Sequence, residues 1–273
     1  MDDTTTVANL LVGQEAAIRL GAFAAVLALM AAWEAARPRR VRQVARRVRW
    51  AANLGIVAID ALAIRVVFPV AAVGMALIAA DQGWGLFNAL AVPFWVAVVL
   101  SVVLLDLAIW TQHLVFHKVP WLWRLHRMHH TDLDFDVTTG LRFHPLEIVL
   151  SMAIKMAVIV ALGAPAAAVV AFEVILNGLA LFNHANVRLP AGIDAVLRRV
   201  IVTPDMHRVH HSVHRDETDS NYGFNLSVWD RLFGTYRAQP RDGHTGMTIG
   251  LDIFRSRRDL TLFRLLVQPF ARA

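Results

Sequence analysis

The chain has 273 residues, of which 57% are hydrophobic, and its mean hydropathy is +0.50. Soluble domains carry about 45–50% apolar residues on a comparable count, and here the apolar residues form long runs, which indicates a polytopic membrane protein. The lack of cysteine excludes disulfides, Cys-ligated zinc and iron–sulfur clusters on this chain. The net charge of +6 comes almost wholly from arginine and favours a role in membrane topology and contact with anionic lipid. Nucleic-acid binding is not expected, because no recognition motif accompanies the charge.

Five apolar runs approach the length of about 20 residues that a membrane-spanning helix needs. The first is interrupted by polar residues and follows an acidic start, so we expect a retained helix and not a signal peptide. The turn at 163–165 predicts a tight hairpin between the last two runs. Within that hairpin we expect Lys155 and Glu173 to form an ion pair, since either charge alone would be costly in a membrane. The runs are roughly 7–33, 51–80, 89–110, 146–162 and 166–182.

Seven arginines lie within residues 37–49, a strong marker of a cytoplasmic loop. The turns near 81–88 and 163–165 are then expected on the outer side, and every histidine-rich segment is expected on the cytoplasmic side. We take the membrane to be a bacterial inner membrane. The mixed, polar tail from about residue 188 is expected to form a cap over these segments. The predicted fold is an all-α membrane protein with four to five transmembrane helices and a cytoplasmic helical cap holding a histidine-rich di-metal site.

Eight histidines form three clusters along the chain. His113 and His117 are four residues apart, and two further clusters share the spacing H-x-x-H-H. Residues i, i+3 and i+4 share one face of a helix, so each triplet is expected to aim its imidazoles at one point. Imidazole is a common metal ligand near neutral pH, and three clusters together predict a polynuclear metal site. The triplets are His126, His129, His130 and His207, His210, His211.

An all-nitrogen ligand set suits zinc, copper, iron or nickel and argues against magnesium or calcium. Eight or nine imidazoles are too many for one zinc ion, which commonly takes four ligands, so we predict two metals with four or five nitrogens each. The metalloprotease pattern H-E-x-x-H is missing. His184, after the fifth run, is the expected ninth ligand, and His144, at the start of the fourth, is expected to line the site. His214 and His244 are expected at the surface.

Other polar residues are candidates for supporting the site. Asp106 precedes His113 by seven residues on the same helix face, so it is expected either to hydrogen-bond a ligand imidazole or to pair with Arg65. Asn186 and Asn221 are expected in the pocket or behind the ligands.

The histidine clusters belong to a longer set of ordered motifs, and with these the chain resembles the fatty acid hydroxylase/sterol desaturase superfamily of integral membrane di-iron enzymes. The resemblance covers roughly residues 49–236. It implies a non-haem di-iron centre with the nine histidines as iron ligands. The motifs are Arg49-Trp50-x-x-Asn53, His113-x-x-x-His117, His126-x-x-His129-His130, Arg142-x-His144-Pro-x-Glu147, Phe182-x-His184-x-Asn186, Thr203-Pro-Asp-Met-His207-x-x-His210-His211, Asn221-Tyr-Gly and Trp229-Asp-Arg-Leu-Phe-Gly-Thr235.

The resemblance further implies an enzyme that uses O₂ and two electrons to hydroxylate or desaturate a lipid, with spans three to five forming the lipid tunnel. Sterols, fatty acyl chains and other isoprenoid or ether lipids all stay open as substrates. A separate donor, a ferredoxin or a cytochrome with its reductase, would supply the electrons, since the sequence lacks cysteine and any His-Pro-Gly-Gly haem motif. The arginines of 37–49 are a candidate docking surface for that donor, although topology and lipid headgroups explain them more simply.

Two other classes of function are compatible with the histidines: a non-catalytic membrane protein that stores or senses metal, and a zinc-dependent membrane hydrolase. The expected organisation is an N-terminal helix and basic loop (1–48), the di-iron domain (49–236) and a cytoplasmic tail (237–273). The sequence leaves the oligomeric state open.

Overall fold

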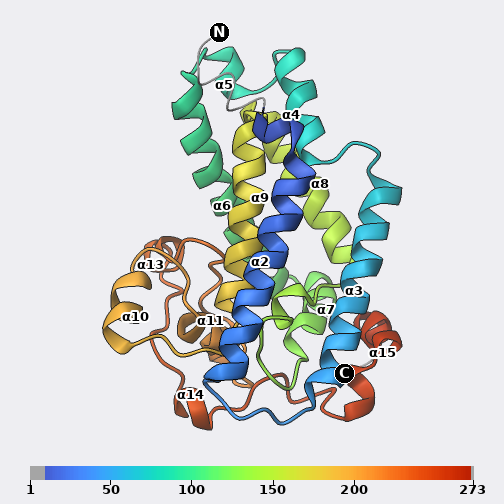
Figure 1. Ribbon diagram of the computed structural model, residues 1–273, viewed down its shortest axis with the longest axis vertical. Helices are drawn as coiled ribbons and strands as arrows, with labels where there is room; N and C mark the ends of the chain where they lie inside the picture. The colour runs from blue at the N-terminus through green and yellow to red at the C-terminus, as the bar shows by residue number, and fades with distance from the viewer. Residues whose placement is uncertain (1–9, 272–273) are drawn as a thin grey trace.

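The computed structural model describes residues 10–271, and within them the chain is built from helices (Figure 1). Five segments are long and apolar enough to cross a membrane, which confirms the all-α membrane class. Residues 7–9 of the first expected run lie outside the described part of the chain. The long helices are α2 (Glu15–Ala36), α3 (Arg46–Val67), α6 (Phe94–Lys118), α8 (Pro145–Leu162) and α9 (Ala166–Asn183).

The second expected run is not one continuous helix. Helix α3 ends at Val67, and the short helices α4 (Ala72–Asp81) and α5 (Leu86–Ala89) follow. The break falls beside Pro69, which has no backbone N–H and disfavours helical geometry at Phe68, where the backbone is extended. The span expected over 51–80 lies within the candidate span Arg46–Ala89, and this proline divides it into separate helices.

Helices α8 and α9 form the expected hairpin. Gly163 ends α8 in the left-handed conformation (φ 67°), and a Cβ atom there would lie 2.6 Å from the carbonyl oxygen of Trp84, so the turn requires glycine. Lys155 on α8 pairs with Glu173 on α9, which confirms the expected ion pair. The other oxygen of Glu173 lies 3.1 Å from Arg19 Nη1 on α2, so a third helix is joined to the hairpin.

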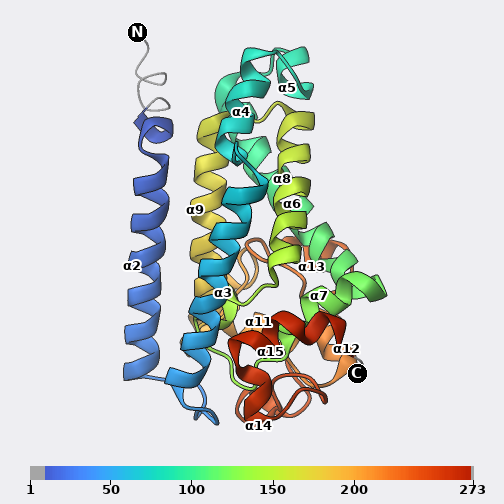
Figure 2. The same cartoon turned by 90° about the vertical axis from the view of Figure 1, so that its right-hand side faces the viewer.

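The remaining helices gather at one end of the bundle as a cap, together with the loop between α2 and α3, whereas α4 and α5 lie at the opposite end (Figures 1 and 2). The expectation that the arginine-rich loop and the histidine-bearing helices share one end is confirmed. The cap contains α7 (Pro120–His130), α10 (Ala191–Leu197), α11 (Pro204–His210), α12 (Arg215–Thr218), α13 (Val228–Leu232), α14 (Gly243–Gly246), α15 (Leu262–Val267) and the 3-10 helices Thr139–Leu141, Arg257–Leu260 and Gln268–Phe270.

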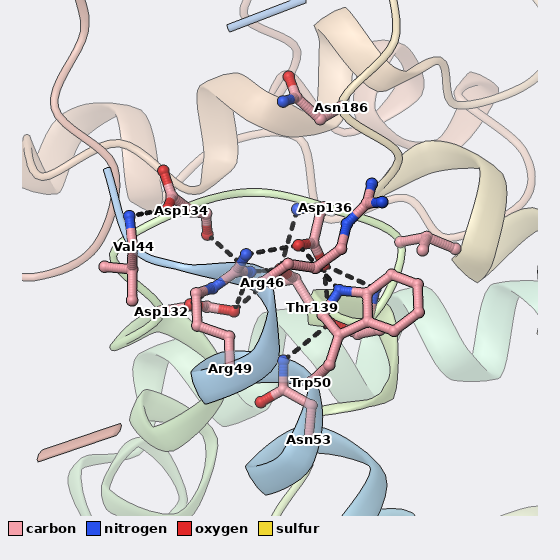
Figure 3. Close-up of polar contacts among 12 residues, drawn as sticks. Val44, Arg46, Arg49, Trp50, Asn53, Asp132, Asp134, Asp136, Thr139 and Asn186 are labelled. Atoms are coloured by element: carbon pink, nitrogen blue, oxygen red, sulfur yellow. Dashed lines mark hydrogen bonds and ion pairs between the residues drawn. The ribbon is translucent and has the colours of Figure 1, made fainter. Parts of the chain in front are cut away.

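Arg49, at the cap end of α3, holds the loop that follows α7 (Figure 3). Its fully buried guanidinium donates from Nε to Asp132 Oδ1 at 2.6 Å and from Nη2 to Asp132 Oδ2 at 2.7 Å, and it also pairs with Asp136. Burial by itself would raise the pKa of Asp132, but the Arg49 and Arg142 guanidiniums lower that pKa to about 2. The carboxylate is therefore charged at neutral pH, and the pair fixes the loop next to the histidines of α7.

Most of the arginines in 37–49 bind within the protein. Arg39 lies 3.2 Å from Asp205 on α11, Arg40 donates to the carbonyl oxygens of His244 and Met247, and Arg46 lies 3.1 Å from Glu34. Together with Arg49, four of the seven arginines thus connect the N-terminal loop to its surroundings. Neither topology nor lipid contact alone explains this stretch. Arg37, Arg42 and Arg47 are exposed.

We expect Arg49→Ala to lower the free energy of unfolding by about 3–5 kcal/mol, because it removes the buried cation that pairs with both Asp132 and Asp136. Arg47→Ala is the matched control, since Arg47 is exposed on the same helix, and its effect should stay within about 0.5 kcal/mol. Denaturant titration in detergent micelles measures both values. Equal effects of the two substitutions would contradict the structural role assigned to Arg49.

Candidate metal centre

Nine histidines are buried together where α6 and α9 meet the cap. They fall into a group of five and a group of four, and within each group one ring nitrogen per residue lies within 4.8 Å of the others. This arrangement agrees with the expectation of two metals, with four or five nitrogens each. The first group is His113, His117, His126, His130 and His210, and the second group is His129, His184, His207 and His211.

Each H-x-x-H-H triplet is divided between the two groups, so the expectation that a triplet aims at one point was wrong. On α7, His126 and His130 belong to the first group and His129 to the second. On α11 the division is reversed, since His210 joins the first group whereas His207 and His211 join the second. With about 100° per residue, position i+4 lies about 40° to one side of i and position i+3 about 60° to the other. Each helix therefore serves both groups.

Burial keeps these imidazoles neutral. It lowers the pKa of His126 to about 3 and that of His184 to about 4. Burial, followed by repulsion between neighbouring rings, lowers the pKa well below 6.5 for the other cap histidines. These are His129, His130, His207, His210 and His211. A neutral imidazole keeps a lone pair for a metal.

Several ring nitrogens in the two groups face one another or have no partner. The Nε2 atom of His184 lies 3.2 Å from Nε2 of His129 and 3.0 Å from Nε2 of His207. Both ring nitrogens of His130 and of His211 are buried without a hydrogen bond. Unsatisfied buried polar atoms are costly, and metal coordination would satisfy them. The donor set therefore fits metal ions.

Contacts behind the rings fix which nitrogen points inward. The Nδ1 atoms of His113, His184 and His210 lie 2.7–2.8 Å from backbone carbonyl oxygens. A carbonyl oxygen only accepts, so Nδ1 carries the proton in these residues and Nε2 keeps its lone pair for the centre. Such contacts orient metal-binding histidines.

A carboxyl group that was not predicted as a site residue also supports the centre. Glu147, in the first turn of α8, places Oε1 2.6 Å from Nδ1 of His126. Its sequence signal was its place in the Arg142-x-His144-Pro-x-Glu147 motif, where only His144 was singled out.

Asp106 has neither of its expected partners. It accepts hydrogen bonds from Trp229 Nε1 at 2.8 Å and from the backbone N of Leu226 at 3.2 Å. It therefore anchors the cap segment around α13 to α6, and it contacts neither a ligand imidazole nor Arg65. The helix spacing placed Asp106 on the same face as His113, but it carried no information about which cap residues pack against that face.

The other three candidates, His144, Asn186 and Asn221, form hydrogen bonds with main-chain groups. His144 caps α8 by accepting from the backbone N of Leu146, and its Nε2 lies 3.1 Å from the carbonyl oxygen of Leu266, outside both histidine groups. Asn186 bonds through its side chain to both backbone groups of Arg40. Asn221 donates to the carbonyl oxygens of Met206 and Arg237.

The two histidines expected at the surface differ. His214 is part-exposed and lies 2.9 Å from Asp242, as a surface residue would. His244 is only 7% exposed and faces Asp205 at 3.7 Å, so its surface assignment was wrong. The fold of the tail brings His244 under the cap.

A cavity of about 410 Å³ opens beside the first histidine group, with His113 and His126 in its wall. Its lining is mostly apolar and comes from α2, α3, α6, α7, α8 and α9, from the loop around Thr139–Leu141 and from Phe224 of the cap. The expectation that spans three to five form the tunnel was therefore incomplete, because α2 and α3 also contribute. The volume lies within the range of about 300–1,000 Å³ that is usual for small-molecule sites.

The fold and the centre define a membrane protein with a buried, histidine-rich site for two metals. Residues 98–235, about half of the chain, match the fatty acid hydroxylase family, so the chain belongs to that family. No solved structure is similar to the chain.

Three relatives are similar to this chain over part of their length. The ornithine lipid hydroxylase OlsE of Rhizobium tropici is 31% identical over 180 residues, which are 66% of this chain and 52% of the relative. The alkylglycerol monooxygenase of Homo sapiens is 32% identical over 55% of this chain and 32% of its own length. The cholesterol 25-hydroxylase of Rattus norvegicus is 24% identical over 52% of this chain and 47% of its own length. The chain thus spans about a third to a half of these relatives.

We expect Glu147→Ala to weaken metal binding about 10–100-fold, because the partner that orients His126 is lost. Titration of the purified protein with zinc against a competing chelator measures this change. Glu147→Gln is the matched variant: its amide oxygen can still accept from His126 Nδ1, so the loss should be smaller. Unchanged zinc affinity in the alanine variant would contradict the assigned role.

Proposed function

We propose that this chain is a membrane-bound, non-haem di-iron hydroxylase that oxidises a lipid with O₂ and electrons from a partner protein. The observation that carries the proposal is the pair of buried histidine groups beside an apolar cavity within the bundle. Family membership supports the same conclusion.

The nine histidines of the two groups would hold the iron ions. Their nitrogens are neutral and buried, and several lack any other partner. Bound iron would supply the activation of O₂ and the cleavage of an unreactive C–H bond, chemistry that protein side chains do not perform unaided.

The protein's own residues would bind and orient the lipid. Helix α6 presents Ile109, His113 and Phe116 to the cavity, so an apolar chain held there lies directly against a ligand of the first group. Phe143 stacks on His129 at 4.5 Å between ring centroids and also lines the cavity. Because the histidines are almost fully buried, the same packing keeps bulk water from the centre.

Among the two outcomes left open by the sequence, we favour hydroxylation over desaturation. The three relatives are named as hydroxylases or a monooxygenase. Their names cover an amino-acid lipid, an ether lipid and a sterol, so they support a lipid substrate without selecting one class.

The orientation and the electron source are also part of this proposal. The positive-inside rule places the arginine-rich loop, and with it the metal centre, on the cytoplasmic side. The exposed Arg37, Arg42 and Arg47 leave positive charge free for anionic lipid or for an acidic ferredoxin or cytochrome.

We expect His129→Ala and His210→Ala each to abolish O₂-dependent turnover, since they remove one ligand from the second and the first group respectively. His214→Ala should retain activity, because His214 lies outside both groups. The purified wild type should contain two iron ions per chain, one for each group. Mass spectrometry of membrane lipids from cells with and without the protein should show the gain of one oxygen atom.

Retained turnover in both ligand variants would refute the ligand assignment. Stoichiometric zinc with hydrolysis and no demand for O₂ would refute the di-iron hydroxylase and favour a zinc hydrolase. Tight metal binding with no lipid change of any kind would favour metal storage.

A further inference from the structure

A carboxyl group in the wall of the cavity has no partner in the described part of the chain. Asp60 lies in the second half of α3, is 9% exposed and lines the cavity. Its Oδ1 atom is buried without a hydrogen bond, and within residues 10–271 no cation lies within ion-pair distance of the side chain. An ionisable group at this position is costly unless something binds it.

Other acidic groups of the long helices do have partners. Glu173 pairs with Lys155 and Arg19, and Glu34 accepts hydrogen bonds from the backbone N of Val137 and of Asn186 and pairs with Arg46. Asp106 accepts from the cap, as described above. Glu147, which also lines the cavity, has one oxygen bonded to His126 and the other unpartnered, whereas no hydrogen bond or ion pair within the described residues reaches either oxygen of Asp60.

The spacing of the lining residues places Asp60 on the face of α3 that is turned to the cavity. Val57, Asp60, Ala61 and Ile64 all line it, at positions i, i+3, i+4 and i+7. The other three are apolar, so Asp60 is the single polar member of this stripe. Helix α6 lines the same cavity with residues that include His113. A lipid in the cavity therefore touches both the acid and the histidine wall.

A second acceptor occurs in the same cavity. Gln112, on the same helix as His113, donates to Ser151 Oγ at 3.0 Å, and its own Oε1 is buried without a partner. The cationic side chain in the lining, Arg19, is already paired with Glu15 and Glu173, although its Nε is unpartnered. The lining thus offers unpartnered carboxyl oxygens of Asp60 and Glu147 and a free amide oxygen, all of which can accept a hydrogen bond.

We propose that Asp60 determines specificity by accepting a hydrogen bond from the lipid, and that the substrates are lipids with a hydrogen-bond donor, a hydroxyl or a protonated amine, on the part held in the cavity. This donor would fix how far the chain enters and hence which carbon lies beside the histidines. The inference rests on the proposed function, because it concerns the lipid that the same cavity takes.

Binding of four C16 compounds to the iron-loaded, full-length protein in detergent micelles tests the proposal. They are hexadecan-1-ol, hexadecan-1-amine, methyl hexadecyl ether and hexadecane, each competing with tritiated hexadecan-1-ol. The alcohol and the amine carry a donor, whereas the ether only accepts. The variants are Asp60→Leu, Asp60→Asn and, as a matched control, Asp81→Asn, which changes an exposed aspartate at the end of α4.

We expect the wild type to bind the alcohol and the amine about tenfold more tightly than the ether, because only these two can donate a hydrogen bond to the Asp60 carboxyl group. Asp60→Leu should reduce both to the level of the ether and leave the ether and hexadecane unchanged. Asp60→Asn should weaken the amine more than the alcohol, because its amide oxygen still accepts but carries no charge. Asp81→Asn should behave as the wild type. Selective binding of the amine alone or of the alcohol alone would support the proposal and identify an amino lipid or a hydroxylated lipid.

Equal binding of alcohol, amine and ether by the wild type would overturn the proposal, since water would then satisfy Asp60. A uniform loss for all four compounds in Asp60→Leu would also overturn it, because the residue would then only shape the cavity. Failure of the proposed function has a different signature: no compound binds and no O₂-dependent lipid oxidation occurs in the wild type.

Discussion

Nine neutral imidazoles packed against one another are the constraint on which the rest of this structure depends. Their ring nitrogens meet at about hydrogen-bond distance, as at His184 and His207, and several have no partner at all. Protonation cannot relieve this arrangement, because burial and mutual repulsion oppose a charge on any ring. A bound metal ion can relieve it, because the metal accepts the lone pairs of the neutral ring nitrogens and no ring has to be protonated. The fold therefore brings together two groups of ring nitrogens that are suited to metal coordination.

Those supporting contacts come from segments that are distant in the sequence. Glu147 on α8 orients His126 on α7, and Arg49 on α3 fixes the loop that leaves α7. Asp106 on α6 binds Trp229 of α13, and the carbonyl oxygen of Tyr222 in the same cap segment contacts His113. Each contact ties a membrane helix to the cap, so bundle and centre stabilise one another. Stability and metal affinity should consequently respond together when these residues change.

The cavity lies beside the first histidine group and is lined by the long helices of the bundle. Its apolar stripes on α3, α6 and α8 suit an acyl or isoprenoid chain, and its position beside His113 brings such a chain to the metal site. Most intramembrane charges of the described residues are neutralised within the protein, as Lys155 and Glu173 show. Asp60 is different, because its carboxyl group has no partner and can select among lipids whose chains are alike by the polar group that they carry.

The sequence by itself determined the membrane class, the five apolar spans and the grouping of the histidine clusters at one end of the bundle, because hydropathy runs, arginine bias and histidine spacing are local signals. It also predicted the pair of Lys155 with Glu173, since a turn of fixed length sets their depth. Only the tertiary structure decided how each triplet is shared between two groups, which partners Asp106 takes, and that Asp60 faces a cavity. Those features depend on which faces of separate helices meet. Helical spacing predicts which residues share a face, but it does not predict which other helix packs against that face.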